Sequence, residues 1–163
     1  MGETAADYLD HKYAPIAVVI FAGLALIAAL AWQLTARKYS SLKYWITVVM
    51  VSVFGTLAAD AVHVVLAVPY WLSTLVFTLG LLLLFIAWKW LEGNLQMDQI
   101  NTARREILYW LVVMATFALG TAAGDWLAMG LGFGFLIGTG IFAIGFAVPL
   151  PLTLIKGPVA TLA

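Results

Sequence analysis

The sequence contains Tyr109-Trp110 followed by Gly120-Thr121-Ala122-Ala123-Gly124-Asp125, and the same arrangement occurs earlier as Tyr44-Trp45 followed by Gly55-Thr56-Leu57-Ala58-Ala59-Asp60. In both copies ten positions separate the tryptophan from the glycine, and five separate the glycine from the aspartate. A partial third copy stands near the N-terminus as Gly2-Glu3-Thr4-Ala5-Ala6-Asp7. Self-similarity at this period indicates that the chain is built from copies of one supersecondary unit.

Each copy continues into a second, aligned half that contains a phenylalanine. Phe77 and Phe142 follow the aspartates of their copies by seventeen positions, and Phe21 follows Asp7 by fourteen. We therefore predict a single membrane domain, 1–163, made of a partial first repeat (1–36), a second repeat (44–91) and a third repeat (107–155).

The composition is that of an integral membrane protein. Of the 163 residues, 64% are hydrophobic and 10% are charged, and the mean hydropathy is +1.05, whereas about a quarter of the residues of a soluble domain are charged. The absence of cysteine excludes disulfides and thiolate metal sites. The formal net charge of zero argues against nucleic acid as a partner.

Long apolar runs predict about five spanning helices, because a hydrocarbon core of ~30 Å needs about 20 helical residues. The runs are 14–34, 44–67, 70–90, 107–129 and 133–148. The predicted fold is an all-α, polytopic transmembrane helical bundle. Since each repeat crosses the membrane twice, the two-helix repeats are expected to be parallel and related by pseudo-rotational symmetry.

The basic residues predict the orientation in the membrane. Seven of the eight lie in loops on one side or after the last span, and only Lys12 lies opposite; the seven are Arg37, Lys38, Lys43, Lys89, Arg104, Arg105 and Lys156. Loops rich in lysine and arginine face the cytoplasm. We therefore expect a bacterial inner (plasma) membrane protein whose basic loops and C-terminus are cytoplasmic and whose motif aspartates lie near the outer face.

With these repeats, the chain resembles uncharacterised bacterial multi-spanning membrane proteins built on a repeat of unknown function with the signature Gly-Glu-Thr-x-x-Asp. Members of that family look like chains of four repeats with two helices each, so the resemblance implies that this chain is a truncated version. The resemblance marks Asp7, Asp60 and Asp125, and it implies no activity.

The motif places an acid and a second oxygen ligand on one helical face. Thr56 and Asp60 are four positions apart, as are Thr121 and Asp125, and as are Glu3 and Asp7. Hard cations prefer carboxylate and hydroxyl oxygens, and acids inside the membrane are candidates for function. The six residues are thus a candidate ion pathway, and the alternative is that the aspartates are structural struts bonded inside the bundle.

Small residues accompany the acids. Gly55 and Ala59, like Gly120 and Gly124, form pairs of small residues four positions apart. Such pairs let helix backbones approach closely in membranes. We therefore predict that they mark helix-packing seams.

Two histidines follow motif aspartates, His63 by three positions and His11 by four. A metal site of aspartate and histidine is one reading, and a haem ligand is another. Lone histidines near a membrane surface are more often interfacial.

The function we expect is a small-cation or metal-ion transporter or channel that uses the aspartates near the outer face. The alternative is a non-catalytic membrane subunit or assembly protein that docks through its glycine-rich seams on a second copy or a partner membrane chain. The sequence contains no phosphate-binding loop, nucleophile elbow or paired-histidine zinc motif. We therefore predict that the protein is not an enzyme, and the sequence indicates no particular cofactor.

Five tryptophans are predicted to form an aromatic belt at the cytoplasmic boundary: Trp32, Trp45, Trp88, Trp90 and Trp110.

Overall fold

The computed structural model describes residues 15–35, 40–95 and 102–147. These residues form α2 (Pro15–Leu34), α3 (Ser41–Leu66), α4 (Tyr70–Glu92), α5 (Ala103–Asp125), a π-helical turn (Trp126–Gly130) and α6 (Gly134–Ala147). The described part of the chain contains helices and no strands, so the predicted all-α fold is confirmed. The candidate residues Glu3, Asp7 and His11 lie outside the described ranges.

Four helices are long and apolar enough to cross a membrane: 17–34 in α2, 41–63 in α3, 70–92 in α4, and 103–130 across α5 and the π-helical turn. The fifth predicted span, 133–148, coincides with α6, a shorter apolar helix of 14 residues. At 1.5 Å per residue α6 is about 21 Å long, less than the ~30 Å of a hydrocarbon core.

Proline and glycine mark the two ends of α4. Pro69 precedes α4 in an extended conformation, and its carbonyl accepts bonds from the N–H groups of Leu72 and Ser73. Gly93 ends α4 with a φ of 74°, where its N–H donates to the carbonyl of Lys89. A residue in this left-handed conformation is a common helix terminator, and glycine adopts it without steric cost.

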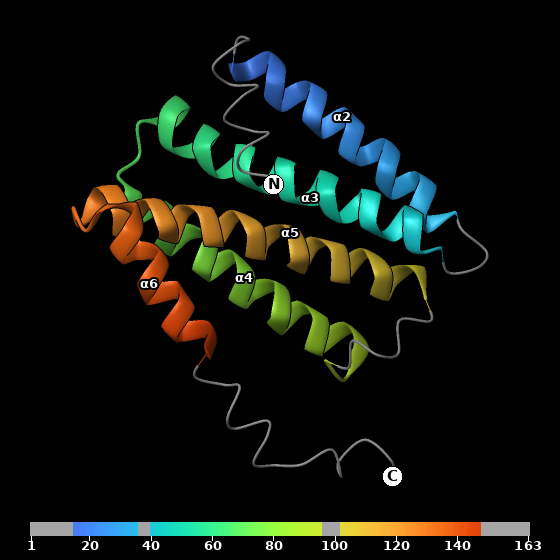
Figure 1. The fold of residues 1–163 in the computed structure, drawn as a ribbon. Coiled ribbons are helices and arrows are strands. Elements are labelled where there is room, and N and C mark those ends of the chain that lie inside the picture. Colours follow the sequence, from blue (N-terminus) through green and yellow to red (C-terminus); the bar gives the residue numbers. More distant parts are fainter. Residues whose placement is uncertain (1–14, 36–39, 96–101, 148–163) are drawn as a thin grey trace. The chain divides into compact units, whose positions relative to one another are not determined.

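The first four helices pack as two hairpins. Val18 of α2 packs on Val53 and Leu57 of α3, and Trp88 of α4 packs on Leu108 and Val112 of α5. In Figure 1 the four helices follow one another in the order α2, α3, α5, α4. The hairpin α2–α3 therefore lies beside the hairpin α4–α5, with α3 and α5 in the middle.

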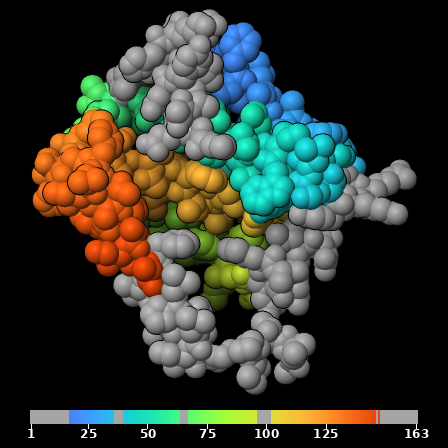
Figure 2. Space-filling model, viewed as in Figure 1, coloured from blue at the N-terminus to red at the C-terminus, as the bar shows by residue number. Residues whose placement is uncertain are grey.

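Two apolar clusters contribute to the contact between the hairpins. Leu26, Val51 and Trp110 form one buried cluster, and three alanines form another with Phe77 of α4 packed against it: Ala59, Ala118 and Ala122. On the face shown in Figure 2, α5 lies between α3 and α4. The helices α3 and α5 run in the same direction, because α4 returns the chain between them.

This packing is offset from the sequence repeat. The second repeat consists of the two successive helices α3 and α4, and the third begins with α5, but the hairpin α4–α5 joins the second helix of one repeat to the first helix of the next. The packing therefore links neighbouring repeats.

Residues 124–147 belong to a second compact unit, which contains the end of α5, the π-helical turn and α6. Within this unit the N–H of Leu131 donates to the carbonyl of Trp126. Gly132 and Gly134 have φ angles of 71° and 73°, so the turn into α6 uses a backbone conformation that favours glycine.

Candidate functional site

Two pairs of equivalent residues meet where α3 packs on α5. The hydroxyl oxygens of Thr56 and Thr121 lie 3.3 Å apart, and those of Tyr44 and Tyr109 lie 2.9 Å apart. Both pairs are separated by 65 positions, the offset between the second and third copies of the motif. Residues that contact their own equivalents lie on a two-fold axis, so a local pseudo-two-fold axis runs between α3 and α5.

The two motif threonines differ from the other threonines in the helices. Among the helical threonines that the structure describes, the rest donate to the carbonyl four residues earlier, at 2.7 to 2.9 Å: Thr47, Thr74, Thr78, Thr116 and Thr139. Thr56 and Thr121 bond to each other instead. Their hydroxyl groups are therefore directed into the contact between the helices and not back to their own helix.

Small residues line the contact around this pair. A Cβ added to Gly55 would lie 2.8 Å from the Cβ of Phe117 and 3.1 Å from the carbonyl oxygen of Met114. Ala59 is 2% exposed and packs with the buried alanines of α5. The backbones of α3 and α5 thus lie close together beside Thr56.

Gly120 and Gly124, the pair of small residues in the third repeat, have different surroundings from Gly55 and Ala59. A Cβ added to Gly120 would meet no atom within 4 Å, and one added to Gly124 would lie 3.9 Å from the ring of Phe142 within the second unit. Equivalent positions of the motif therefore carry out different packing roles in the two repeats.

The threonine pair lies near the middle of α3. Thr56 is fifteen residues from Ser41 and ten from Leu66, which correspond to about 22 Å and 15 Å along the helix. Asp60 is partly buried and follows Thr56 by one turn. Asp125 is the last residue of α5, directly before the π-helical turn, and belongs to the second unit. The structure thus joins the two threonines and does not relate the two aspartates.

His63 lies in the last turn of α3. Its Nδ1 atom is 2.6 Å from the carbonyl oxygen of Val68, and its ring stacks on Tyr70 with centroids 3.7 Å apart. A bond to a carbonyl requires that Nδ1 carries the proton, which leaves Nε2 as the nitrogen that could bind a metal. In the described ranges no three side chains of His, Asp or Glu gather as a potential metal site.

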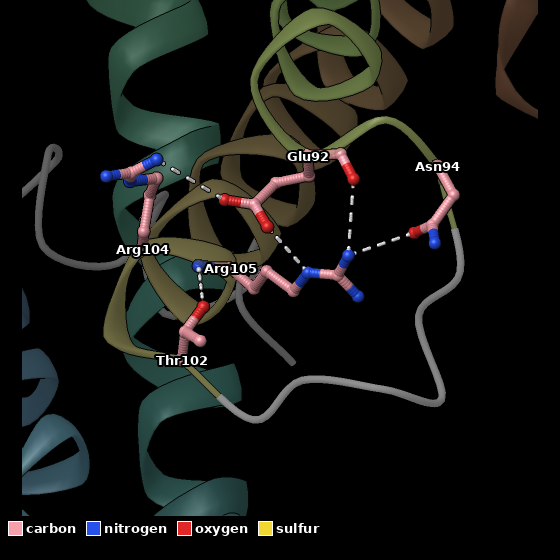
Figure 3. Close-up of polar contacts among 5 residues, drawn as sticks. All are labelled: Glu92, Asn94, Thr102, Arg104 and Arg105. Atoms are coloured by element: carbon pink, nitrogen blue, oxygen red, sulfur yellow. Dashed lines mark hydrogen bonds and ion pairs between the residues drawn. The ribbon is translucent and has the colours of Figure 1, made fainter.

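Polar contacts also gather at the opposite end of the bundle, which we call the basic end because it carries Lys43, Lys89, Arg104 and Arg105. The Nε atom of Arg105 lies 2.7 Å from a carboxylate oxygen of Glu92, and both side chains are 13% exposed. Arg105 also donates to Asn94, and the exposed Arg104 lies 3.9 Å from the same carboxylate (Figure 3). These contacts join the end of α4 to the start of α5.

Sequence reasoning missed the polar contacts of the basic end. The spacing of 65 positions identifies Tyr44 and Tyr109 as equivalent residues, but it does not indicate that their hydroxyls are in contact. The pair Glu92–Arg105, and the bond of 3.1 Å from Gln33 to Glu106, connect residues on different helices and have no local sequence signal.

The predicted tryptophan belt is wrong for two of its members. Trp88 and Trp110 are 0% and 3% exposed, because α5 packs between α3 and α4 and both side chains enter that core. Trp32, Trp45 and Trp90 are exposed, as a belt requires.

One protein family matches two segments of the chain, residues 43–94 and 108–155. The first segment begins in the first turn of α3 and includes α4, and the second begins in α5 and includes α6. No curated protein and no solved structure matches the chain. Because the two segments make up more than half of its residues, the chain belongs to the family described as Repeat of Unknown Function (DUF347).

Proposed function

We propose that the protein moves a small cation across a membrane, and that the cation binds between α3 and α5 at Thr56, Thr121 and Asp60. The observation that carries this proposal is the 3.3 Å contact between the two threonine hydroxyls on the local axis. Asp125, the equivalent of Asp60, is proposed as a second acid of the pathway.

The chemistry of these groups favours a hard cation. Hydroxyl and carboxylate oxygens are the ligands that such ions take in proteins. A polar group inside a bilayer is costly unless it is paired. In the threonine pair only one hydroxyl can donate to the other at a time, because each hydroxyl has a single proton. A cation between them would use the lone pairs of both oxygens.

The position of the threonines also supports transport. They lie near the middle of a helix that is long enough to span, at the contact between equivalent helices of two repeats. Many transporters bind substrate near the bilayer midplane at such a contact between repeats. In the proposed orientation the basic end is cytoplasmic, the end with Asp60 is outside, and the membrane is a bacterial inner membrane.

The test is cation flux into proteoliposomes with Mn²⁺, Mg²⁺, Ca²⁺, K⁺ and H⁺ supplied separately. The parent is compared with Thr56→Val together with Thr121→Val, with Asp60→Asn, and with the control Thr116→Val, whose hydroxyl bonds to its own helix. We expect flux of one cation in the parent and in the control, and a loss of at least tenfold in the other two variants. A parent that moves none of these ions, or flux that survives the paired threonine change, would overturn the proposal.

The close contact at Gly55 supports a second candidate function, that of a non-catalytic membrane subunit. In this role the small-residue seams hold helices together, and the chain associates with a second copy or with another membrane chain. Here the threonine variants would reduce stability or association without changing any flux. Neither candidate function requires the chain to catalyse a reaction.

A further inference from the structure

We propose that the hairpins α2–α3 and α4–α5 tilt against each other about Gly55, and that Tyr44–Tyr109 and Gln33–Glu106 form a latch that closes the basic end. This inference rests on the proposed function, for which it supplies the movement that exposes the site to the basic side. Rocking of one bundle against another around a central site is a known route to alternating access.

Each hairpin is held together by its own contacts. In α4–α5, Arg105 pairs with Glu92 at the basic end, and Thr74 donates to the carbonyl of Ala122 at 2.9 Å near the other end. In α2–α3, the ammonium of Lys43 lies 5.1 Å from the centroid of a Trp32 ring. These contacts, with the apolar clusters inside each hairpin, favour movement of each hairpin as one body.

The contact between the hairpins is of a different kind. It includes three polar pairs: Thr56–Thr121 beside Gly55, and the two pairs of the latch at the basic end. Each pair is joined by a hydrogen bond between side chains. The backbones approach closely at Gly55, and towards the basic end the hairpins are joined by the two latch bonds and by the buried cluster of Leu26, Val51 and Trp110.

A cavity lies between the hairpins on the basic side of Gly55. It has a volume of about 70 Å³, and its apolar lining includes residues of both hairpins: Leu26, Leu30 and Leu34 of α2, and Ile107, Trp110 and Leu111 of α5. On the side that the proposal requires to open, the hairpins therefore leave a gap beside the buried side chains of Leu26 and Trp110.

The distance from Gly55 to Tyr44 along α3 means that a small tilt is sufficient to open the latch. Tyr44 is eleven residues from Gly55, which is about 16 Å along α3. A tilt of about 10° at Gly55 would therefore move Tyr44 by about 3 Å, which would break its bond to Tyr109.

The experiment measures distances between spin labels in lipid nanodiscs, and the absence of native cysteines makes the labelling specific. The pair Leu42→Cys with Ile107→Cys reports between hairpins, and both positions are exposed. The pairs Ala31→Cys with Leu42→Cys, and Leu91→Cys with Ile107→Cys, report within each hairpin. All three pairs are measured in the parent and in a latch variant that carries Tyr44→Phe, Tyr109→Phe and Gln33→Leu.

In the latch variant we expect the distance between hairpins to increase by several ångströms and both distances within hairpins to stay unchanged. Tyr109→Phe alone, which keeps the tyrosine ring packing and the bond of Gln33, should give a smaller shift in the same direction. An unchanged distance between hairpins in both variants would overturn the proposal, and so would equal changes in all three pairs. Because no cation is needed, a shift between hairpins in a protein without flux would contradict the proposed function and leave the tilt supported.

Discussion

The hydroxyl oxygens of Tyr44 and Tyr109 lie 2.9 Å apart, and the two residues occupy the same position in successive repeats. A pair of hydroxyls makes one bond whichever of them donates, so removing either hydroxyl removes that bond. Tyr44→Phe and Tyr109→Phe should each lower the free energy of unfolding. In the double variant the loss should be smaller than the sum of the two by about 0.5 to 1 kcal/mol. The measurement is reversible unfolding in mixed micelles, and strictly additive losses would show that the hydroxyls do not interact.

Gly55 and Gly120 provide a matched pair, because they occupy equivalent positions with different surroundings. Gly55→Ala would place a methyl group 2.8 Å from the Cβ of Phe117 and should cost about 1 to 3 kcal/mol in stability. Gly120→Ala meets open space and should be neutral or stabilise by up to about 1 kcal/mol, because alanine is the better helix former. Thermal unfolding of the two variants in detergent checks this prediction, which fails if both changes have the same effect.

Trp110 and Trp45 form a second matched pair, since they are 3% and 60% exposed at equivalent positions. Trp110→Ala should lower stability by about 3 to 5 kcal/mol, because it empties a filled part of the core, whereas Trp45→Ala should cost less than about 1 kcal/mol. The indole N–H of Trp110 is buried without a hydrogen-bond partner among the described residues, so Trp110→Phe should cost less than the change to alanine. Denaturant titrations of the three variants measure these differences, and a comparable loss at Trp45 would contradict the packing.

Arg105 and Arg104 contact the same carboxylate of Glu92 at 2.7 Å and 3.9 Å, and their side chains are 13% and 69% exposed. Arg105→Ala should destabilise the protein by about 2 kcal/mol, because it leaves a largely buried carboxylate without its nearest cation. Arg104→Ala should cost less than about 0.5 kcal/mol, since exposed ion pairs contribute little. Protection of the junction between α4 and α5 against protease distinguishes the two variants, and it should fall only in Arg105→Ala.

The bounds of the helices could be predicted because they depend on local sequence. Apolar runs, Pro69 at the start of α4 and the glycines before α6 are visible without knowledge of any neighbour, and the observed helices begin and end near the predicted positions. The 65-residue offset likewise identified equivalent residues before any of them had been placed in space.

The contacts between helices could not be predicted, because they depend on which faces meet. Trp32 and Trp88 hold equivalent positions, yet they are 44% and 0% exposed, since only Trp88 faces the core beside α5. Nothing in the sequence indicated that Thr56 would bond to Thr121 and not to its own helix. The relation between Asp60 and Asp125 remains a prediction.

The offset between packing and sequence repeat bears on how such a chain can change in length. A gene that gains one whole repeat inserts two helices, and these complete a hairpin with the helix before them and open a new hairpin with the helix after them. Neighbouring repeats are therefore interlocked, so that exchanging one repeat between related chains alters two hairpins at once. Recombination that preserves the packing would need its crossover points in the turns between hairpins, such as the turn at Val68 and Pro69 that separates α3 from α4.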